Sequence, residues 1–175
     1  RELIRCPTAG LKMVGIDAPA VKDVIITHMH YDHVGNFDLF PNATFHLQDR
    51  EVAYSTGRQM TKTVFSAAYN VEDVVDVVRG VYEGRVTFHN GDARLAPGGS
   101  IHHIGGHTDG LQIVRVWTER GWVVLAADAS HLYANMDQVN PFPIVFNVGD
   151  MVAGYDQLRE LADTTDHIIP GHDPL

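Results

Sequence analysis

Short apolar runs, separated by turn-forming residues, dominate the hydrophobic pattern of the chain. Val24-Ile25-Ile26 is one such run, and residues 43–47 alternate weakly between apolar and polar positions. Runs of this length and composition are typical of β-strands. We therefore expect a buried strand at residues 24–27 and a second strand at residues 43–47.

Helical patterns alternate with these strands. Residues 48–56 have a helical composition that ends before Gly57, and a short helix at residues 34–40 would stop at Pro41. Asn70 is expected to cap a further helix, since asparagine at an N-cap accepts a hydrogen bond from the first turn. Four residues at helical spacing would form the buried face of that helix: Val71, Val74, Val75 and Val78.

The second half of the sequence favours strands that precede a final helix and a last short strand. The expected strands are residues 86–89, 93–95, 100–104, the hairpin 111–117 with 122–127, and 167–169. Residues 136–150 have the composition of a loop, and residues 151–162 have the period of an amphipathic helix. The pattern predicts a mixed α/β fold in which chain reversals follow many strands.

Composition narrows the class of protein. The chain has 175 residues, a formal charge of −9 and no cluster of lysine or arginine, so nucleic acid and anionic membranes are poor partners. No apolar run reaches the roughly 18 residues of a membrane span. The lone cysteine, Cys6, excludes an internal disulfide and a cysteine-rich zinc site. We expect one domain over residues 1–175 and a cytoplasmic location.

Four side chains that can bind metals follow the first predicted strand: His28, His30, Asp32 and His33. His28 and His30 are two residues apart, so they point to the same side of an extended chain. Asp32 and His33 are adjacent, and they diverge only where the chain turns. Borderline ions such as zinc favour imidazole and carboxylate ligands, so the spacing suits two neighbouring metal ions.

Three more candidates occupy the ends of later strands. His107 lies between glycine pairs, Asp128 follows the apolar strand 122–127, and His172 follows Gly171. Asp128 could instead cap the next turn, but with two metals suspected nearby we favour a ligand. His46 is expected to be a packing histidine, and neither His102 nor His103 is assigned to the site.

These residues together resemble the metallo-β-lactamase superfamily, whose members carry an HxHxDH motif, a later Gly-His, an Asp after a strand and a final Gly-His. The resemblance spans residues 24–172 and fills all seven ligand positions. It implies a four-layer αβ/βα sandwich with two zinc ions. One ion would be held by His28, His30 and His107, the second by Asp32, His33 and His172, and Asp128 would bridge them.

Within the superfamily, the run 127–130 and Gly171-His172-Asp173 look most like the N-acyl homoserine lactonase branch. That branch implies a small lactone substrate, opened by a hydroxide shared between the two metals, with Asp32 carrying a proton to the leaving group. The branch often has a tyrosine three residues after the bridging Asp; here the position is His131, with Tyr133 two residues further on. Either residue could polarise the substrate carbonyl, or neither. The candidates for an acyl groove are Met136, Phe142, Phe146 and Met151, although apolar residues in such a loop more often belong to the core.

Only 27 residues precede His28, whereas the resemblance implies several strands before the motif. We therefore expect a domain that lacks most N-terminal strands of its first sheet and that is weakly folded or poorly active alone. Three functions stay open: a lactonase; another two-metal hydrolase acting on a thioester, aryl ester or phosphodiester; and a non-catalytic metal-binding fragment. A homodimer is among the assemblies that the sequence allows.

Overall fold

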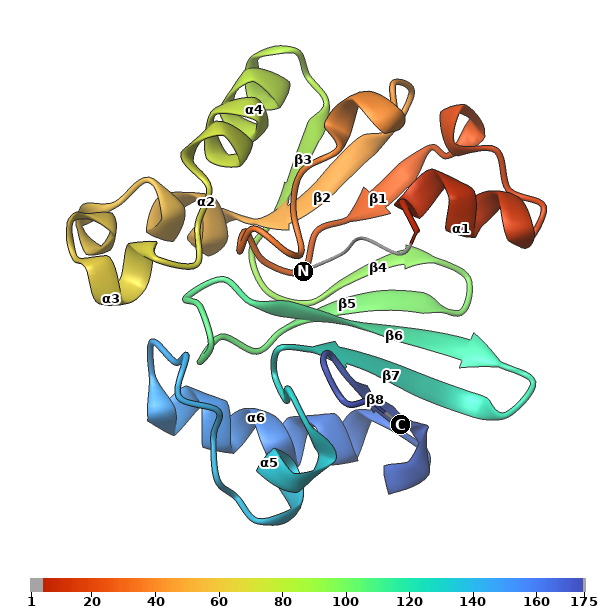
Figure 1. The fold of residues 1–175 in the computed structure, drawn as a ribbon. Coiled ribbons are helices and arrows are strands. Elements are labelled where there is room, and N and C mark those ends of the chain that lie inside the picture. The colour runs from red at the N-terminus through yellow and green to blue at the C-terminus, as the bar shows by residue number, and fades with distance from the viewer. Residues whose placement is uncertain (1–4, 175) are drawn as a thin grey trace.

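The first sheet consists of three parallel strands. A computed structural model of the protein describes residues 5–174. In it, β1 (Asp23–Ile25), β2 (Thr44–Gln48) and β3 (Val86–His89) lie in the order β1-β2-β3 (Figure 1). The paired residues Val24 and Phe45 fix the first register, and Phe45 with Val86 fixes the second. The expected strands at 24–27 and 43–47 are confirmed with shifts of one or two residues.

The second sheet has five strands in sequence order. They are β4 (Ala93–Ala96), β5 (Gly99–His103), β6 (Gln112–Thr118), β7 (Gly121–Ala127) and β8 (Ile168–Pro170). Neighbouring strands are antiparallel except β7 and β8, which are parallel. The predicted hairpin of β6 and β7 is confirmed. The turn at Asn90-Gly91 joins the two sheets rather than two strands of one hairpin.

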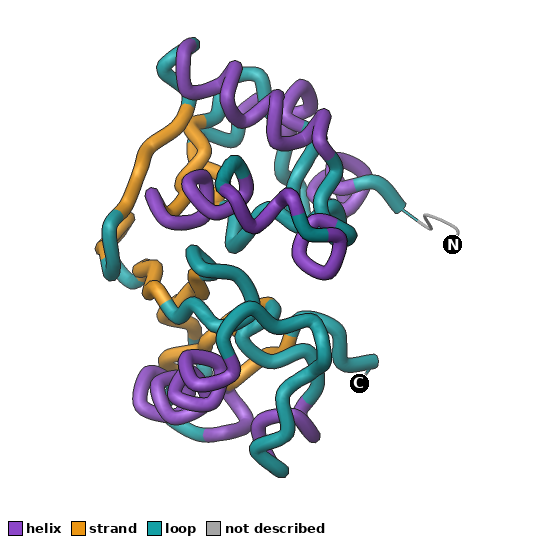
Figure 2. The backbone as a smooth tube through the Cα atoms, turned by 90° about the vertical axis from the view of Figure 1, so that its left-hand side faces the viewer, coloured by secondary structure: helices purple, strands orange, loops and turns teal. Residues whose placement is uncertain are grey.

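Helices cover the outer face of each sheet, which gives four layers of the α/β/β/α type (Figures 1 and 2). The described helices are α1 (Pro7–Met13), α2 (Asp49–Ser55), α3 (Thr63–Ser66), α4 (Val71–Tyr82), α5 (Tyr133–Asp137) and α6 (Val148–Leu161). The four-layer α/β architecture that the sequence predicts is therefore confirmed. Among the described residues, no helix has the length and apolar character needed to span a membrane.

Each sheet packs against its helices through a separate hydrophobic cluster. Ile113 and Val124 of the second sheet pack with Met151, Tyr155 and Leu158 of α6. Phe45 and Leu47 of the first sheet pack with valines of α4 in the other cluster. Between these two cores, the halves of the chain meet along a seam of buried polar side chains that includes Gln48 and Gln112. The candidate site lies on that seam.

The predicted buried face of α4 is partly wrong. Asn70 does cap this helix, because its side-chain oxygen accepts a hydrogen bond from the backbone N–H of Glu72. Val74 and Val77 are buried, at 9% and 1% exposure, whereas Val71 is 67% exposed and Val78 is 37% exposed. In a helix this rich in valine, several stripes fit the same period, and packing against β2 selects one of them.

Three other boundaries differ from the expectations. Residues 34–40 form only a 3-10 turn over Phe37–Leu39, and the residue before it, Asn36, has a left-handed backbone with φ 55°. The expected loop at 136–150 holds the end of α5 and the start of α6. Asn147 explains the early start of α6, because its side chain accepts hydrogen bonds from the N–H groups of Gly149 and Asp150.

Buried amide side chains join the two sheets along the seam. Gln112 of β6 donates to the carbonyl oxygens of Ile26 and His46, at 2.9 and 3.0 Å. Gln48 of β2 donates to the side-chain oxygen of Gln112 at 2.9 Å. These bonds satisfy polar groups at the centre of the molecule and fix how the loops of the two halves face each other.

Candidate metal centre

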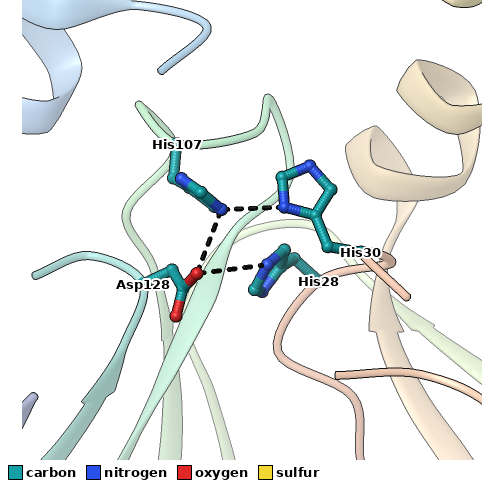
Figure 3. Close-up of side chains that lie close together, drawn as sticks. All are labelled: His28, His30, His107 and Asp128. Carbon is teal, nitrogen blue, oxygen red and sulfur yellow. Dashed lines mark hydrogen bonds and ion pairs between the residues drawn. The ribbon is translucent and has the colours of Figure 1, made fainter. Parts of the chain in front are cut away.

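The candidate ligands all lie in loops that follow strands and meet at one end of the seam. His28 and His30 follow β1, and His107 follows β5 in a loop that begins with Gly105 and Gly106, whose φ angles are 72° and 81°. Asp128 follows β7, and His172 follows β8. Figure 3 shows His28 and His107 facing the Asp128 carboxylate and His30 facing His107, so that loops of both sheets contribute to one cluster.

The first group of candidate ligands contains His28, His30, His107 and Asp128, all of them buried. Nε2 of His107 lies 2.9 Å from Nδ1 of His30 and 3.2 Å from Oδ2 of Asp128. Nε2 of His28 lies 3.8 Å from the same carboxylate oxygen. The four ligand atoms lie within 4.8 Å of one another, which is the scale of a single ion's coordination sphere.

The second group contains Asp32, His33 and His172 and is more open to solvent. Nε2 of His33 and Nε2 of His172 are 3.3 Å apart. Oδ2 of Asp32 lies 3.8 Å from the first of these nitrogens and 3.7 Å from the second. The turn after His30 therefore separates the Asp32-His33 pair from the His28-His30 pair, as their spacing predicts.

One carboxylate faces both groups. Oδ2 of Asp128 is turned towards His28 and His107, whereas Oδ1 lies 3.3 Å from Nε2 of His33 and 3.2 Å from Nε2 of His172. The residue before it, Ala127, has φ 44°, a conformation that is unfavourable for a side chain larger than hydrogen. Strain of this kind persists where the surrounding structure imposes it, and here it directs Asp128 into the site.

Burial and close contacts shift the protonation of the cluster. Burial, together with repulsion from His107, holds the pKa of His28 well below its usual value and lowers the pKa of His30 to about 3. Although burial opposes the charge on Asp128, its close contacts with His107, His131 and His33 lower the pKa of this carboxyl. The first group therefore holds neutral His28 and His30 beside an ionised Asp128, whereas in the second group the nearby Asp128 raises the pKa of His33 despite its burial.

The residues fit a pair of divalent ions. Nε2 of His28 and Oδ1 of Asp128 are buried with no hydrogen-bond partner among the described residues. Nδ1 of His107 lies 2.7 Å from the carbonyl oxygen of Ile144, so it carries the ring proton and leaves Nε2 free to bind a metal. Neutral imidazoles and carboxylates are the donors that zinc and similar ions prefer.

Comparison with known proteins agrees with this geometry. Residues 3–172 match the family described as the metallo-beta-lactamase superfamily. The chain belongs to the metallo-beta-lactamase superfamily. Both the four layers and the position of the histidine cluster at the ends of the strands follow from that membership.

Several similar members of the superfamily are lactonases. The chain is 29% identical to the N-acyl homoserine lactonase AttM of Azorhizobium caulinodans, over 95% of this chain and 63% of that protein. It is 29% identical to an N-acyl homoserine lactonase of a Bacillus species, over 75% of this chain and 48% of that protein. The chain thus spans less than two thirds of the length of these curated relatives.

A solved structure gives the same answer for the fold. It is an N-acyl homoserine lactone hydrolase with the product N-hexanoyl-L-homoserine bound at its catalytic metal centre. This chain matches it with a TM-score of 0.77 and 25% identity, over 95% of this chain and 62% of that one. The predicted resemblance to the superfamily and to its lactonase branch is confirmed at the level of similarity.

The two candidates for polarising the substrate carbonyl, His131 and Tyr133, lie in different surroundings. His131 is buried beside the site, with Nε2 3.1 Å from Oδ2 of Asp128 and its ring stacked on Phe142. Tyr133 packs against the hydrophobic cluster of the second sheet, and its backbone N–H donates to Asp173. The structure thus brings His131 to the site and does not place Tyr133 there.

A cavity of about 410 Å³ opens over the two groups of ligands. Its polar lining residues include His30, Asp32, Asp128 and His172. Its apolar lining residues are Ala68, Leu132, Phe142 and Ile144. Of the candidates for an acyl groove, Phe142 lines this cavity, whereas Met136 and Met151 are buried in the hydrophobic cluster of the second sheet.

Phe146, the fourth residue proposed for the groove, contacts aromatic rings instead of lining this cavity. Its ring lies 4.8 Å from the ring of Tyr54 and 5.9 Å from that of Phe65, measured between centroids. These contacts hold the loop before α6 against the helices α2 and α3. Phe146 therefore supports the wall of the cavity from behind.

The other histidines named in the sequence lie away from the metal centre. His46 bonds to Asp23 and His89 in the first sheet, as expected for a packing residue. His102 lies between Ser100 and Asp92, at 2.9 and 2.7 Å.

Sequence reasoning missed one buried acid beside the site. Glu51 of α2 is fully buried and accepts hydrogen bonds from both histidine-bearing loops. Its sequence context, an acidic residue in the first turn of a helix, is typical of an exposed position favoured by the helix dipole. Nothing in that local pattern indicates burial, because the donors lie 22 to 59 residues away along the chain.

Proposed function

We propose that this chain carries the two-metal site of a hydrolase that opens the lactone ring of N-acyl homoserine lactones. The two groups of ligands would each hold a divalent ion, with zinc as the expected metal. The observation that carries the proposal is the Asp128 carboxylate, one oxygen of which faces His28 and His107 while the other faces His33 and His172. A carboxylate shared in this way suits two ions held close together.

The metal ions, when bound, would lower the pKa of a water molecule towards neutrality and so supply a nucleophile for the lactone carbonyl. The protein's part is to position the substrate and to move a proton. Asp32 lines the cavity on its open side, with a side chain that is 34% exposed. We assign to its carboxylate the transfer of a proton to the ring oxygen that leaves.

The cavity matches the chemistry of an acylated lactone. Its volume of about 410 Å³ is within the usual range for small-molecule sites, roughly 300–1,000 Å³. The polar lining residues suit the lactone and its amide, and the apolar residues Leu132, Phe142 and Ile144 suit the acyl chain. Nε2 of His131 lies 3.1 Å from Oδ2 of Asp128, so a proton on that nitrogen would let His131 donate to the carboxylate and hold it in place.

Metal analysis combined with a lactone-opening assay tests the proposal. Ring opening releases one proton, so a pH-monitored assay follows it directly. We expect two zinc ions per chain and hydrolysis of N-acyl homoserine lactones in preference to thioester, aryl ester and phosphodiester substrates. Preferred cleavage of one of the other three classes, by a chain holding two ions, would contradict the assigned substrate and keep the two-metal hydrolase.

A variant of the shared carboxylate tests whether the site is catalytic. Asp128→Asn removes the negative charge that faces both groups, and we expect at least about a 100-fold loss of hydrolysis, as for other groups that act on charge in the transition state. Asp92→Asn is the matched control, because Asp92 pairs with His102 far from the cavity. Equal activity of Asp128→Asn and the wild-type protein would contradict an enzyme with bridged metals.

A further inference from the structure

Glu51 holds together the two loops that carry the first group of ligands. Its side chain is fully buried, and a buried carboxylate is costly unless hydrogen bonds satisfy its oxygens. Oε1 accepts from the backbone N–H of Met29 at 2.8 Å and from the Tyr69 hydroxyl at 3.2 Å. Oε2 accepts from the Thr108 hydroxyl at 2.6 Å and from the backbone N–H of Gly110 at 3.1 Å.

Each oxygen serves a different half of the molecule. Met29 lies between His28 and His30, and the ring of Tyr69 packs edge-on against that of His30 with 4.7 Å between centroids. Thr108 directly follows His107. One carboxylate thus ties the loop after β1 to the loop after β5, and these loops supply three of the four ligands in the first group.

The packing around this carboxylate leaves little freedom. A Cβ atom at Gly110 would overlap the backbone of Glu51, so the loop can approach α2 this closely only with glycine. Gly106, at the start of the same loop, would meet the backbone of Met151 in the same way. The His107 loop is therefore clamped between α2 and α6, and the α2 side of the clamp is Glu51.

We propose that Glu51 is a positioning residue that sets the spacing of the His28-His30 and His107 loops, and thereby the affinity of the first group of ligands for its ion. None of the four hydrogen bonds that Glu51 accepts comes from the second group, Asp32, His33 and His172. The effect of losing Glu51 is therefore selective for one of the two ions. Groups that orient metal ligands typically change metal affinity 10- to 100-fold.

Glu51→Gln tests the proposal with little change in volume. An amide offers one oxygen and one NH₂ group, so it turns a donor towards either Met29 or Gly110 and leaves that backbone N–H unpaired. In a zinc titration against a chromophoric chelator, we expect one of the two ions to bind about 10- to 100-fold more weakly and the other to keep its affinity. In the metal-free protein, amide hydrogen exchange at Met29 or Gly110 should become faster.

Gln48→Glu is the matched control. Gln48 is also fully buried and also bonds across the seam, but its partners are Gly91 and Gln112 and not the histidine loops. Glu51→Gln replaces a carboxylate by an amide, and Gln48→Glu replaces an amide by a carboxylate. For Gln48→Glu we expect a lower melting temperature and unchanged affinities for both zinc ions. An equal loss of one ion in both variants would overturn the selective role of Glu51 and leave a general effect of stability.

Thr108→Val covers the case in which Glu51→Gln does not fold. This change keeps the carboxylate of Glu51 and replaces one donor, the Thr108 hydroxyl, by a methyl group of similar size. We therefore expect a smaller loss of affinity for the same ion. Unchanged zinc affinities in Thr108→Val and in folded Glu51→Gln would overturn the proposal.

The inference rests on the two metal ions of the proposed function but not on its substrate. Two bound ions without lactone hydrolysis would overturn only the proposed activity. A wild-type chain that binds no zinc would overturn both the proposed function and the role of Glu51.

Discussion

Gly171 shows how closely the chain approaches itself at the metal centre. A Cβ atom on this residue would lie 2.5 Å from Oδ1 of Asp128 and 2.7 Å from the carbonyl oxygen of Ala127. These distances are shorter than real Cβ contacts, and the second involves backbone that cannot swing away. The glycine before His172 is therefore required by the space that Asp128 occupies, not by its own backbone conformation.

We expect Gly171→Ala to push the His172 loop away from the shared carboxylate. The second group would then lose a ligand, so zinc binding should fall towards one ion per chain and hydrolysis by at least about tenfold, the lower end for disturbed metal sites. Gly10→Ala in α1 is the matched control, because a Cβ atom there meets nothing within 4 Å. Wild-type zinc content in Gly171→Ala would show that the loop relaxes without cost.

At the scale of the element, α4 tests which stripe of a valine-rich helix is buried. Val77 is 1% exposed in the first-sheet cluster, and Val71 is 67% exposed at the first turn. The same substitution at the two positions therefore separates packing from helix propensity.

Val77→Ala should lower the free energy of unfolding by about 2 kcal/mol, because it removes two buried methyl groups and leaves a cavity. Val71→Ala should change it by less than about 0.5 kcal/mol, as is usual at exposed positions. Urea unfolding of both variants measures the difference. A large loss at Val71 with little change at Val77 would mean that α4 packs through the stripe that the sequence suggests.

A hydrogen-bonded chain crosses the three strands of the first sheet. Nε2 of His46 lies 3.0 Å from Oδ1 of Asp23, and Nδ1 of His46 lies 3.0 Å from Nε2 of His89. Burial and the neighbouring His46 lower the pKa of His89 below its usual value of 6.5. The folded protein therefore favours neutral His89, and its stabilising effect is present above pH 6.5 and is lost as the pH falls through the lowered pKa.

NMR titration of the His89 ring should give a midpoint below 6.5. His46→Gln should move that midpoint up towards 6.5, because it removes the neighbouring imidazole. A midpoint at or above 6.5 in the wild-type protein would contradict this arrangement of the three strands.

The sequence predicts local features of the fold and of the site well. The spacing of His28, His30, Asp32 and His33 and the turn beyond them indicate two groups of ligands, because strand alternation and chain reversal are local properties. The same reasoning finds His107, Asp128 and His172 at strand ends. It does not find Glu51, because the partners that make it important come from loops distant in sequence. The sequence also does not predict where the Tyr133 side chain points. That direction depends on packing against the hydrophobic cluster of the second sheet, whose residues come from distant parts of the chain.

At the scale of the whole molecule, the two halves carry separate hydrophobic cores and share the ligand set. The first half supplies His28, His30, Asp32 and His33, and the second supplies His107, Asp128 and His172. Ions that bind both halves at once should stabilise the folded state over the unfolded chain by mass action.

Removal of metal should therefore lower the melting temperature of the protein. Zinc at about 1,000 times its dissociation constant adds about 4 kcal/mol per site to the free energy of unfolding. Thermal melts with zinc and with a chelator measure the shift, and Asp92→Asn, which lies outside the site, should show the same shift as the wild-type protein. An identical melting temperature with and without zinc would contradict ligation across the seam.

The single passage of the chain between the sheets, at Asn90-Gly91, has a consequence for protein engineering. A backbone cut at this turn would give two fragments, each with its own apolar cluster and each holding an incomplete set of donors. Association of the two fragments would then depend on zinc, so it would report the concentration of free zinc, and a chelator would dissociate the fragments.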